Sequence, residues 1–157
     1  MKKQKLNIGC SGWNYDHWKG LFYPEESSPR TWFKEYSSHF KTVEINNTFY
    51  QLPEERTFVS WEEQAPRGFV YAVKASRYIT HMKKLKDPKK PVRLLLSRAR
   101  LLKKHLGPVL FQLPPNWKVN TKRLDGFTDV LPAGLDYVFE FRNPSWYKDE
   151  VYKLLDK

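Results

Sequence analysis

The sequence predicts an α/β protein built around a parallel sheet, and three observations lead to this fold class. Segments typical of strands and of helices alternate along the 157 residues in the order βαβαβαβαβα. The segment PVLFQL at 108–113 is almost entirely apolar, as a strand covered on both faces should be. The strand that begins at Thr42 leads within a few residues into a helix. A doubly wound open sheet and part of a (βα)8 barrel both fit this pattern.

The first part of the chain predicts one strand and one helix. Residues 6–10 form the predicted strand, which ends in the glycine-containing turn CSGWNY. The aromatic loop WKGLFYP at 18–24 has no periodicity, and we interpret it as a packed cover, with a lid as the alternative. A helix is predicted at 30–40, with Pro29 near its start. Its apolar stripe consists of Trp32, Phe33, Tyr36 and Phe40.

The stretch TVEINNTFYQLP at 42–53 is the most informative part of the chain. Val43 and Ile45 alternate with Glu44 and Asn46, which is typical of a strand. Strands of a βα unit are covered on both faces, so Glu44 and Asn46 would point into an enclosed place. An enclosed carboxylate needs partners or a chemical task. This stretch therefore indicates where a functional site should lie.

The remaining elements complete the alternation. The predicted helices cover 53–65, 91–106 and 121–131, the predicted strands cover 69–76, 108–113 and 137–142, and Ser145 would cap a last helix that runs towards Leu155. We interpret Gly107-Pro108 as the stop of the helix at 91–106. The chain contains no internal repeat and no obvious linker, which predicts a single domain over 1–157.

The positive charge of the chain is concentrated in one segment. The net charge is +11, and residues 83–104 contain ten Lys or Arg residues against one acid, Asp87. One interpretation is a solvated helix face that keeps the protein soluble. The other is a surface for an anionic partner such as nucleic acid or acidic lipid.

Composition also excludes some classes. The sequence has no run of about 18 apolar residues, so we expect no membrane span. The segment MKKQKLNIGC has basic residues but lacks the apolar core of a secretory signal. Cys10 is the single cysteine, which excludes an internal disulfide framework and fits a reducing cytosol. We therefore expect a cytoplasmic location.

Two sets of motifs distinguish the candidate architectures. The chain has neither G-x-G-x-x-G nor G-x-x-x-x-G-K-[ST], so the most specific support for a doubly wound sheet is absent. By contrast, IGCSGWNY, VEINNTFYQLP, FVYAVKASRYITH, LFQLPP and FEFRNPSW resemble, in this order, the motifs of the YecE-like family, called domain of unknown function 72. The resemblance implies a TIM-type barrel whose biochemical role is not established.

The length of the chain departs from that family. A (βα)8 barrel takes about 250 residues, whereas this chain predicts about five parallel βα units. We therefore expect an N-terminal portion of a TIM-type barrel, either a fragment of a longer product or a part completed by another chain. Such a sheet would have unpaired edges and an uncovered face, which favour self-association.

In a barrel the active site lies at the carboxyl ends of the strands. Alternation places seven polar side chains on inward faces, namely Glu44, Asn46, Lys74, Ser76, Gln112, Glu140 and Arg142. Charged groups in a barrel interior are costly unless they are paired, so one interpretation is an internal salt-bridge network. The other is the floor of a ligand pocket.

The ligand-pocket interpretation assigns roles to these residues. Glu44 and Glu140 are the candidate acid/base groups. Lys74 and Arg142 would hold an anionic group of the substrate. The remaining predicted substrate-binding residues are Trp13 and Trp146, which would stack on a ring, and Asn46, Ser76 and Gln112, which would orient the substrate.

Three functional hypotheses follow. The first is an enzyme that acts on an anionic, phosphorylated or nucleic-acid substrate. The second is a non-catalytic nucleic-acid-binding protein that uses the basic segment 83–104. The third is an inactive truncated product. The sequence names no cofactor, and its four histidines have no metal-ligand spacing, so no metal site is predicted.

Overall fold

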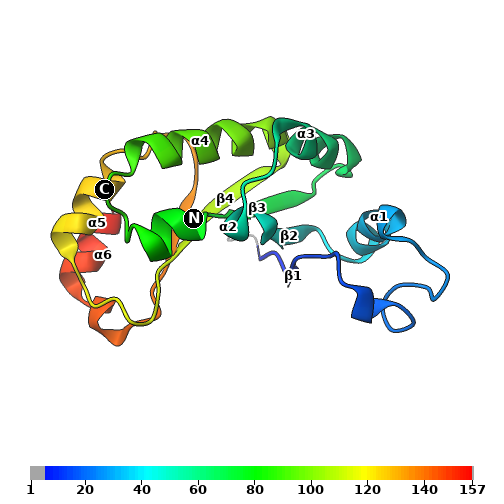
Figure 1. Ribbon diagram of the computed structural model, residues 1–157, viewed down its shortest axis with the longest axis horizontal. Helices are drawn as coiled ribbons and strands as arrows, with labels where there is room; N and C mark the ends of the chain where they lie inside the picture. The colour runs from blue at the N-terminus through cyan, green and yellow to red at the C-terminus, as the bar shows by residue number, and fades with distance from the viewer. Residues whose placement is uncertain (1–5, 157) are drawn as a thin grey trace.

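The computed structural model describes residues 6–156. Its strands form one parallel sheet in which the order along the sheet is the order along the chain (Figure 1). The strands are β1 (Cys10–Ser11), β2 (Thr42–Ile45), β3 (Val70–Lys74), β4 (Leu106–Gln112) and β5 (Tyr137–Glu140). A doubly wound sheet reverses its strand order, and this sheet does not. The chain thus forms five βα units of a TIM-type barrel, as the sequence predicts.

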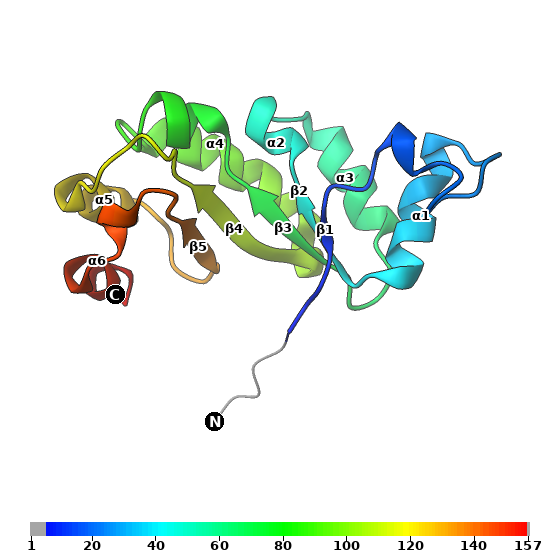
Figure 2. The same cartoon turned by 90° about the horizontal axis from the view of Figure 1, so that it is seen from below.

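Helices connect the strands. They are α1 (Pro29–His39), α2 (Asn47–Tyr50), α3 (Glu55–Gln64), α4 (Lys89–Ala99), α5 (Thr121–Thr128) and α6 (Asp149–Leu155). Short 3-10 helices lie at Asp16–Trp18, Arg100–His105 and Pro144–Trp146, and a π-helix lies at Tyr78–Met82. In Figures 1 and 2, α3 and α4 lie along one side of the sheet, and no helix of residues 6–156 covers the opposite side.

The two sides of the sheet differ in composition. We call the side towards the helices the outer face; it carries the buried side chains Val43, Ile45, Tyr71, Val73, Val109 and Phe111. We call the other side the inner face; it carries Glu44, Ala72, Lys74, Leu110, Gln112, Val138 and Glu140. Most of the apolar core therefore lies between the sheet and its helices.

The core on the outer face is rich in aromatic rings. Phe33 of α1 stacks on Tyr71 with ring centroids 5.8 Å apart, and Phe111 contacts Phe127 of α5 at 4.9 Å. The hydroxyl of Tyr36 accepts a hydrogen bond from the Cys10 backbone nitrogen at 2.7 Å and donates one to the Thr42 carbonyl at 2.9 Å. The aromatic stripe predicted for the first helix thus fixes α1 to the first two strands.

The bounds predicted for the first strand are wrong. Pairing with β2 begins at Cys10, which lies opposite Val43, whereas residues 6–9 are not in a strand. Because β2 itself begins at Thr42, the residues before Gly9 have no strand beside them. Leu6 and Ile8 are accordingly 84% and 70% exposed.

The predicted stop at Gly107-Pro108 is also wrong, because both residues lie inside β4. The register between β3 and β4 shifts here, since Tyr71 pairs with Leu106 but Val73 pairs with Val109. A Cβ on Gly107 would lie 2.4 Å from the Val70 side chain, so only glycine fits this close approach. Glycine and proline thus mark an irregularity of the strand and not its boundary.

The helix predicted at 91–106 ends early. Its helical geometry gives way to a 3-10 segment after Ala99, and Lys103 there has φ 48° and ψ −122°. Four short helical segments were not predicted: α2, the π-helix Tyr78–Met82, and the 3-10 helices Asp16–Trp18 and Pro144–Trp146. Ser145 does not cap the last helix; its hydroxyl accepts a hydrogen bond from the Val119 backbone nitrogen at 2.8 Å.

The basic segment 83–104 lies on the outer side of the fold. The apolar side chains of α4 and of the segment after it, Val92, Leu95, Leu96, Ala99 and Leu102, are buried against the core. Its exposed basic residues are Lys86, Lys89, Lys90, Arg93, Arg100, Lys103 and Lys104. Arg98 pairs with Glu55, and Lys103 pairs with Glu62 at 3.1 Å, so part of the charge joins this segment to α3.

Candidate functional site

A cavity of about 710 Å³ lies at the carboxyl ends of the strands. Four predicted site residues line it: Asn46 after β2, Lys74 at the end of β3, Gln112 at the end of β4, and Arg142 just after β5. The remaining lining residues are Phe49, Tyr50, Arg77, His81 and Met82. We call this cavity the cationic pocket, because Lys74, Arg77 and Arg142 all line it.

Two carboxylates on the inner face support these cations. Glu44 Oε1 lies 3.2 Å from Lys74 Nζ and accepts a hydrogen bond of 2.7 Å from the Ser11 hydroxyl. Glu140 accepts one of 2.7 Å from Gln112 Nε2 and one of 2.6 Å from Arg142 Nε. Both candidate acid/base residues thus contact side chains that line the pocket.

The charge state of Glu140 follows from its surroundings. Burial alone would raise the pKa of this carboxyl. The hydrogen bonds from Gln112 and Arg142, with the charges of Arg142 and Lys74, outweigh burial and hold the pKa below its usual value. Glu140 is therefore ionised at neutral pH.

The cations keep nitrogen atoms available for a ligand. Arg142 contacts Glu140 through Nε, so neither terminal nitrogen of its guanidinium is used in that pair. Within residues 6–156, Arg77 has no ion pair. A planar guanidinium with free terminal nitrogens suits a carboxylate or phosphate group.

His81 also lines the pocket, although the sequence did not single it out as a site residue. It lies in the π-helix Tyr78–Met82, with Nδ1 2.9 Å from the Thr80 hydroxyl and its ring 5.1 Å from that of Phe49. Burial lowers its pKa, and the charges of Arg142, Lys74 and Arg77 lower it further. π-helical turns occur frequently at functional sites. No pattern in the sequence distinguishes this turn from a loop.

Five of the predicted site residues do not line the cationic pocket. Glu44 and Glu140 only contact side chains that line it, and the other three are Ser76, Trp146 and Trp13. The Ser76 hydroxyl accepts a hydrogen bond of 3.2 Å from the Tyr78 backbone nitrogen. Trp146 is completely buried, stacked on Phe141 at 5.0 Å. Trp13 lines a second cavity of about 460 Å³ between the turn after β1 and helices α1 and α3.

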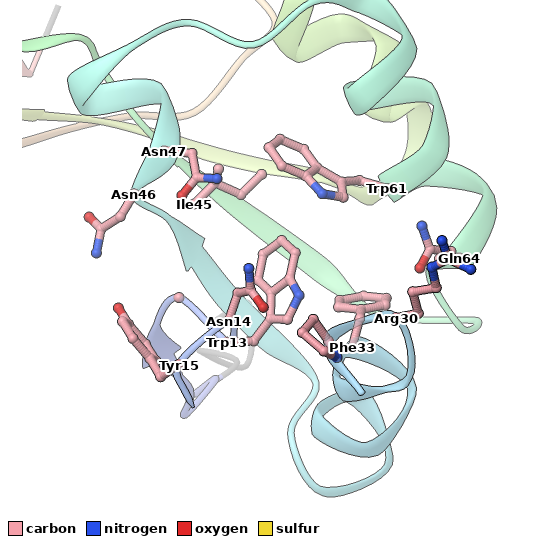
Figure 3. A pocket seen from close by; sticks show the side chains of 12 residues that line it. Trp13, Asn14, Tyr15, Arg30, Phe33, Ile45, Asn46, Asn47, Trp61 and Gln64 are labelled. Carbon is pink, nitrogen blue, oxygen red and sulfur yellow. The ribbon is translucent and has the colours of Figure 1, made fainter. Parts of the chain in front are cut away.

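This second cavity, which we call the aromatic pocket, combines rings with amides (Figure 3). Trp13 contacts Phe33 and Trp61 edge to face, with centroids 5.2 and 5.7 Å apart. In Figure 3, Asn46 and Asn47 lie on one side of these rings and Arg30 and Gln64 on the other. The sequence interpretation missed this pocket, because α1 and α3 are far apart along the chain.

Two searches of the described part of the chain, 6–156, gave negative results. It holds no group of three or more His, Cys, Asp or Glu residues that could bind a metal ion. It also has no helix that is long and apolar enough to cross a membrane.

Related proteins align with almost the whole length of this chain. UPF0759 protein YecE of Escherichia coli K12 is 30% identical over 154 residues, which cover 97% of this chain and 54% of the relative. UPF0759 protein YunF of Bacillus subtilis is 29% identical over 158 residues, with 94% and 54% coverage. The chain spans about half the length of the curated relatives it matches.

Solved structures agree with the fold. A DUF72 family protein from Thermotoga maritima matches with a TM-score of 0.80 at 31% identity, covering 95% of this chain and 60% of the other. One from Enterococcus faecalis matches with a TM-score of 0.74 at 20% identity, a likeness of fold alone, covering 95% and 55%. The family model described as "Protein of unknown function DUF72" matches residues 7–157, which confirms the resemblance seen in the motifs. The chain therefore belongs to the DUF72 family.

Proposed function

We propose that this protein is an enzyme that acts on an anionic, phosphorylated substrate held in the cationic pocket. The observation that carries the proposal is the convergence of Lys74, Arg77 and Arg142 on one cavity of about 710 Å³. Lys74 and Arg77 lie at and just after the end of β3, and Arg142 lies just after β5, so the cations come from the carboxyl ends of two strands, where the active-site groups of a barrel lie. A phosphate would accept hydrogen bonds from the guanidinium groups and attract the Lys74 ammonium.

The acid/base group of this proposal is Glu44. Its Oε1 contacts Ser11 and Lys74, whereas Oε2 has no hydrogen-bond partner within residues 6–156. A carboxylate with one open oxygen can accept a proton from a substrate or a water molecule. Glu140 is the second candidate, and its bonds to Gln112 and Arg142 also position those two side chains.

Calorimetry with inorganic phosphate at neutral pH tests the anion site. Arg142→Ala removes one guanidinium from the pocket and should weaken phosphate binding about 10-fold or more, as for a hydrogen bond to a charged group. Arg67→Ala is the matched control, because Arg67 is exposed and has no ion pair among the described residues. Equal phosphate affinity in both variants would rule out the proposed site.

Turnover of phosphate esters tests the acid/base assignment separately. Glu44→Gln removes the proton acceptor but keeps a side chain of similar size that can still contact Ser11. We expect this variant to bind phosphate and to lose at least about 100-fold in kcat, within the usual range for general acid–base catalysis. A Glu44→Gln enzyme with wild-type turnover would exclude Glu44 as the acid/base group.

A second candidate function is nucleic-acid binding by the basic segment 83–104, and the exposure of its Lys and Arg side chains favours it. Phosphate contacts made by this segment would give a log-linear loss of affinity with salt. Replacing Lys89, Lys90 and Arg93 with Glu should reduce both the affinity and the salt slope. Unchanged binding would exclude the segment as the nucleic-acid contact.

A further inference from the structure

The aromatic pocket has the features of a site for a flat heterocyclic ring. Trp13, Phe33, Trp61 and Ile45 give it apolar walls, and Trp13 is only partly buried, so its ring can contact a ligand (Figure 3). Flat π-systems are favoured partners of exposed aromatic rings. The rings provide contact area, but they do not make the pocket selective for one flat ligand over another.

Polar groups around these rings would provide the selectivity for one flat ligand. Among residues 6–156, the side chains of Asn14, Asn47 and Arg30 have no hydrogen-bond partner, although all three line the pocket. By contrast, the amides of Asn120 and Asn143 accept hydrogen bonds from backbone nitrogens at helix starts. A side-chain amide offers a donor and an acceptor in one plane, which matches the edge of a nucleobase.

The aromatic pocket and the cationic pocket meet at one residue. Asn46 lines both cavities, and two hydrogen bonds from its Nδ2 to Ser11, to the carbonyl at 3.2 Å and to the hydroxyl at 2.5 Å, hold it in place. The short helix α2 follows directly, with Asn47 at the aromatic pocket and Phe49 at the cationic pocket. One ligand could therefore reach both cavities past Asn46.

We propose that the two pockets form one site for a nucleoside phosphate, with the base in the aromatic pocket and the phosphate among Lys74, Arg77 and Arg142. The phosphate half rests on the proposed function, and the base half stands on the aromatic pocket alone. The aromatic rings and side-chain amides of the first cavity and the three cations of the second match the two parts of a nucleotide. A sugar phosphate would leave the indole rings and the side-chain amides without a matching partner.

Calorimetry on the 157-residue chain can measure the two halves separately. The probes are inorganic phosphate, adenosine, the four nucleoside 5′-monophosphates and glucose 6-phosphate. We expect at least one monophosphate to bind about 10-fold or more tightly than phosphate, its nucleoside or glucose 6-phosphate, because one molecule fills both cavities. Asn47→Ala should remove most of that advantage and leave phosphate affinity unchanged, while Arg142→Ala should weaken phosphate and the nucleotide alike.

Asn116→Ala is the matched control, since Asn116 is exposed and lines neither pocket. Asn14→Ala provides a second exposed variant at the aromatic pocket, and circular dichroism melts verify that each variant folds. Phosphate binding with no gain for any nucleotide would overturn the base half and leave the proposed function standing. Nucleoside binding without phosphate binding would overturn the phosphate half and the proposed function together. Equal affinity for glucose 6-phosphate and the best nucleotide would also overturn the inference.

Discussion

The two faces of the same sheet serve different purposes. On the outer face Tyr71, Val73, Val109 and Phe111 are fully buried against helices. On the inner face the same strands present Glu44, Lys74, Gln112 and Glu140, and the gap between neighbouring strands is bridged by charge and hydrogen bonds. Because side chains alternate along a strand, one short segment can supply both faces.

The residues that stabilise the fold and the residues proposed for binding and catalysis lie on opposite faces of the sheet. Packing of apolar side chains on the outer face fixes the strands, so the inner face is free to carry groups that cost free energy to assemble. Substitutions on the two faces should therefore differ both in size and in kind.

The largest effect is expected in the outer core. Phe111→Ala removes a fully buried ring that contacts Phe127 and Phe139, and it should lower the free energy of unfolding by about 3–5 kcal/mol. Leu110→Ala, one residue away on the inner face, is the comparison and should cost only about 1 kcal/mol. Urea unfolding of both variants measures the contrast, and equal losses would mean that both faces are packed alike.

Next in size is the ion pair of the inner face. The side chain of Lys74 is 13% exposed, so Glu44→Ala should leave a mostly buried ammonium without its partner and cost about 1–3 kcal/mol. Adding Lys74→Met should recover much of the loss. Glu54→Ala breaks the exposed pair with Arg56 and should cost under about 1 kcal/mol. Thermal and urea unfolding compare the three, and a double variant no more stable than Glu44→Ala would contradict the explanation.

The third prediction concerns self-association, which the open inner face and the edge strands favour. Val138 on the edge strand β5 is 45% exposed. We expect light scattering to detect dimers or larger species, and Val138→Lys to weaken association about 10-fold, because an edge lysine disfavours strand pairing. Val59→Lys on α3 is the control. A monodisperse wild-type monomer would show that neither the face nor the edges recruit a partner.

The smallest effect is a pH dependence from Glu140. Its pKa is lowered in the folded protein, so its contribution to stability is present above the unfolded-state value of about 4.3 and is lost as pH falls through the folded-state value. Glu140→Gln should therefore flatten the fall of the melting temperature below pH of about 4.3. Melting curves of both proteins between neutral and acidic pH test this; parallel curves would assign the acid sensitivity to other groups.

Much of the fold follows from sequence pattern. The order of strands and helices and the parallel sheet were predicted from hydrophobic alternation, and the family was identified from the resemblance of five ordered motifs. Errors arose where a local signal had two meanings. Gly107-Pro108 usually ends a helix, but here it fits a close approach and a register shift inside β4. The correct interpretation depends on the contact of Gly107 with β3, and β3 lies more than 30 residues earlier in the chain.

The candidate site also consists of a part that the sequence predicted and a part that it did not. The two-residue period of strands placed Glu44, Lys74, Gln112 and Glu140 on one side of the sheet, and the structure joins them pairwise. Among the four histidines, His81 was the one expected near the mouth of the barrel, but it was not predicted as a site residue, because the π-helix that holds it has no recognisable sequence pattern. The aromatic pocket was missed because it depends on the contact between helices that only tertiary packing brings together. The binding and catalytic roles of all these residues remain predictions.

The sequential strand order also has a consequence for how the molecule unfolds. Within residues 6–156, every strand pairs only with the strands of the preceding and following units, so no strand there is inserted between two partners distant in the sequence. Such a sheet can open from either edge, one unit at a time, as repeat proteins do. Amide hydrogen exchange should therefore be slowest in β3 and β4 and progressively faster towards β1 and β5, which places the Lys74 and Gln112 backbone in the most persistent part of the molecule.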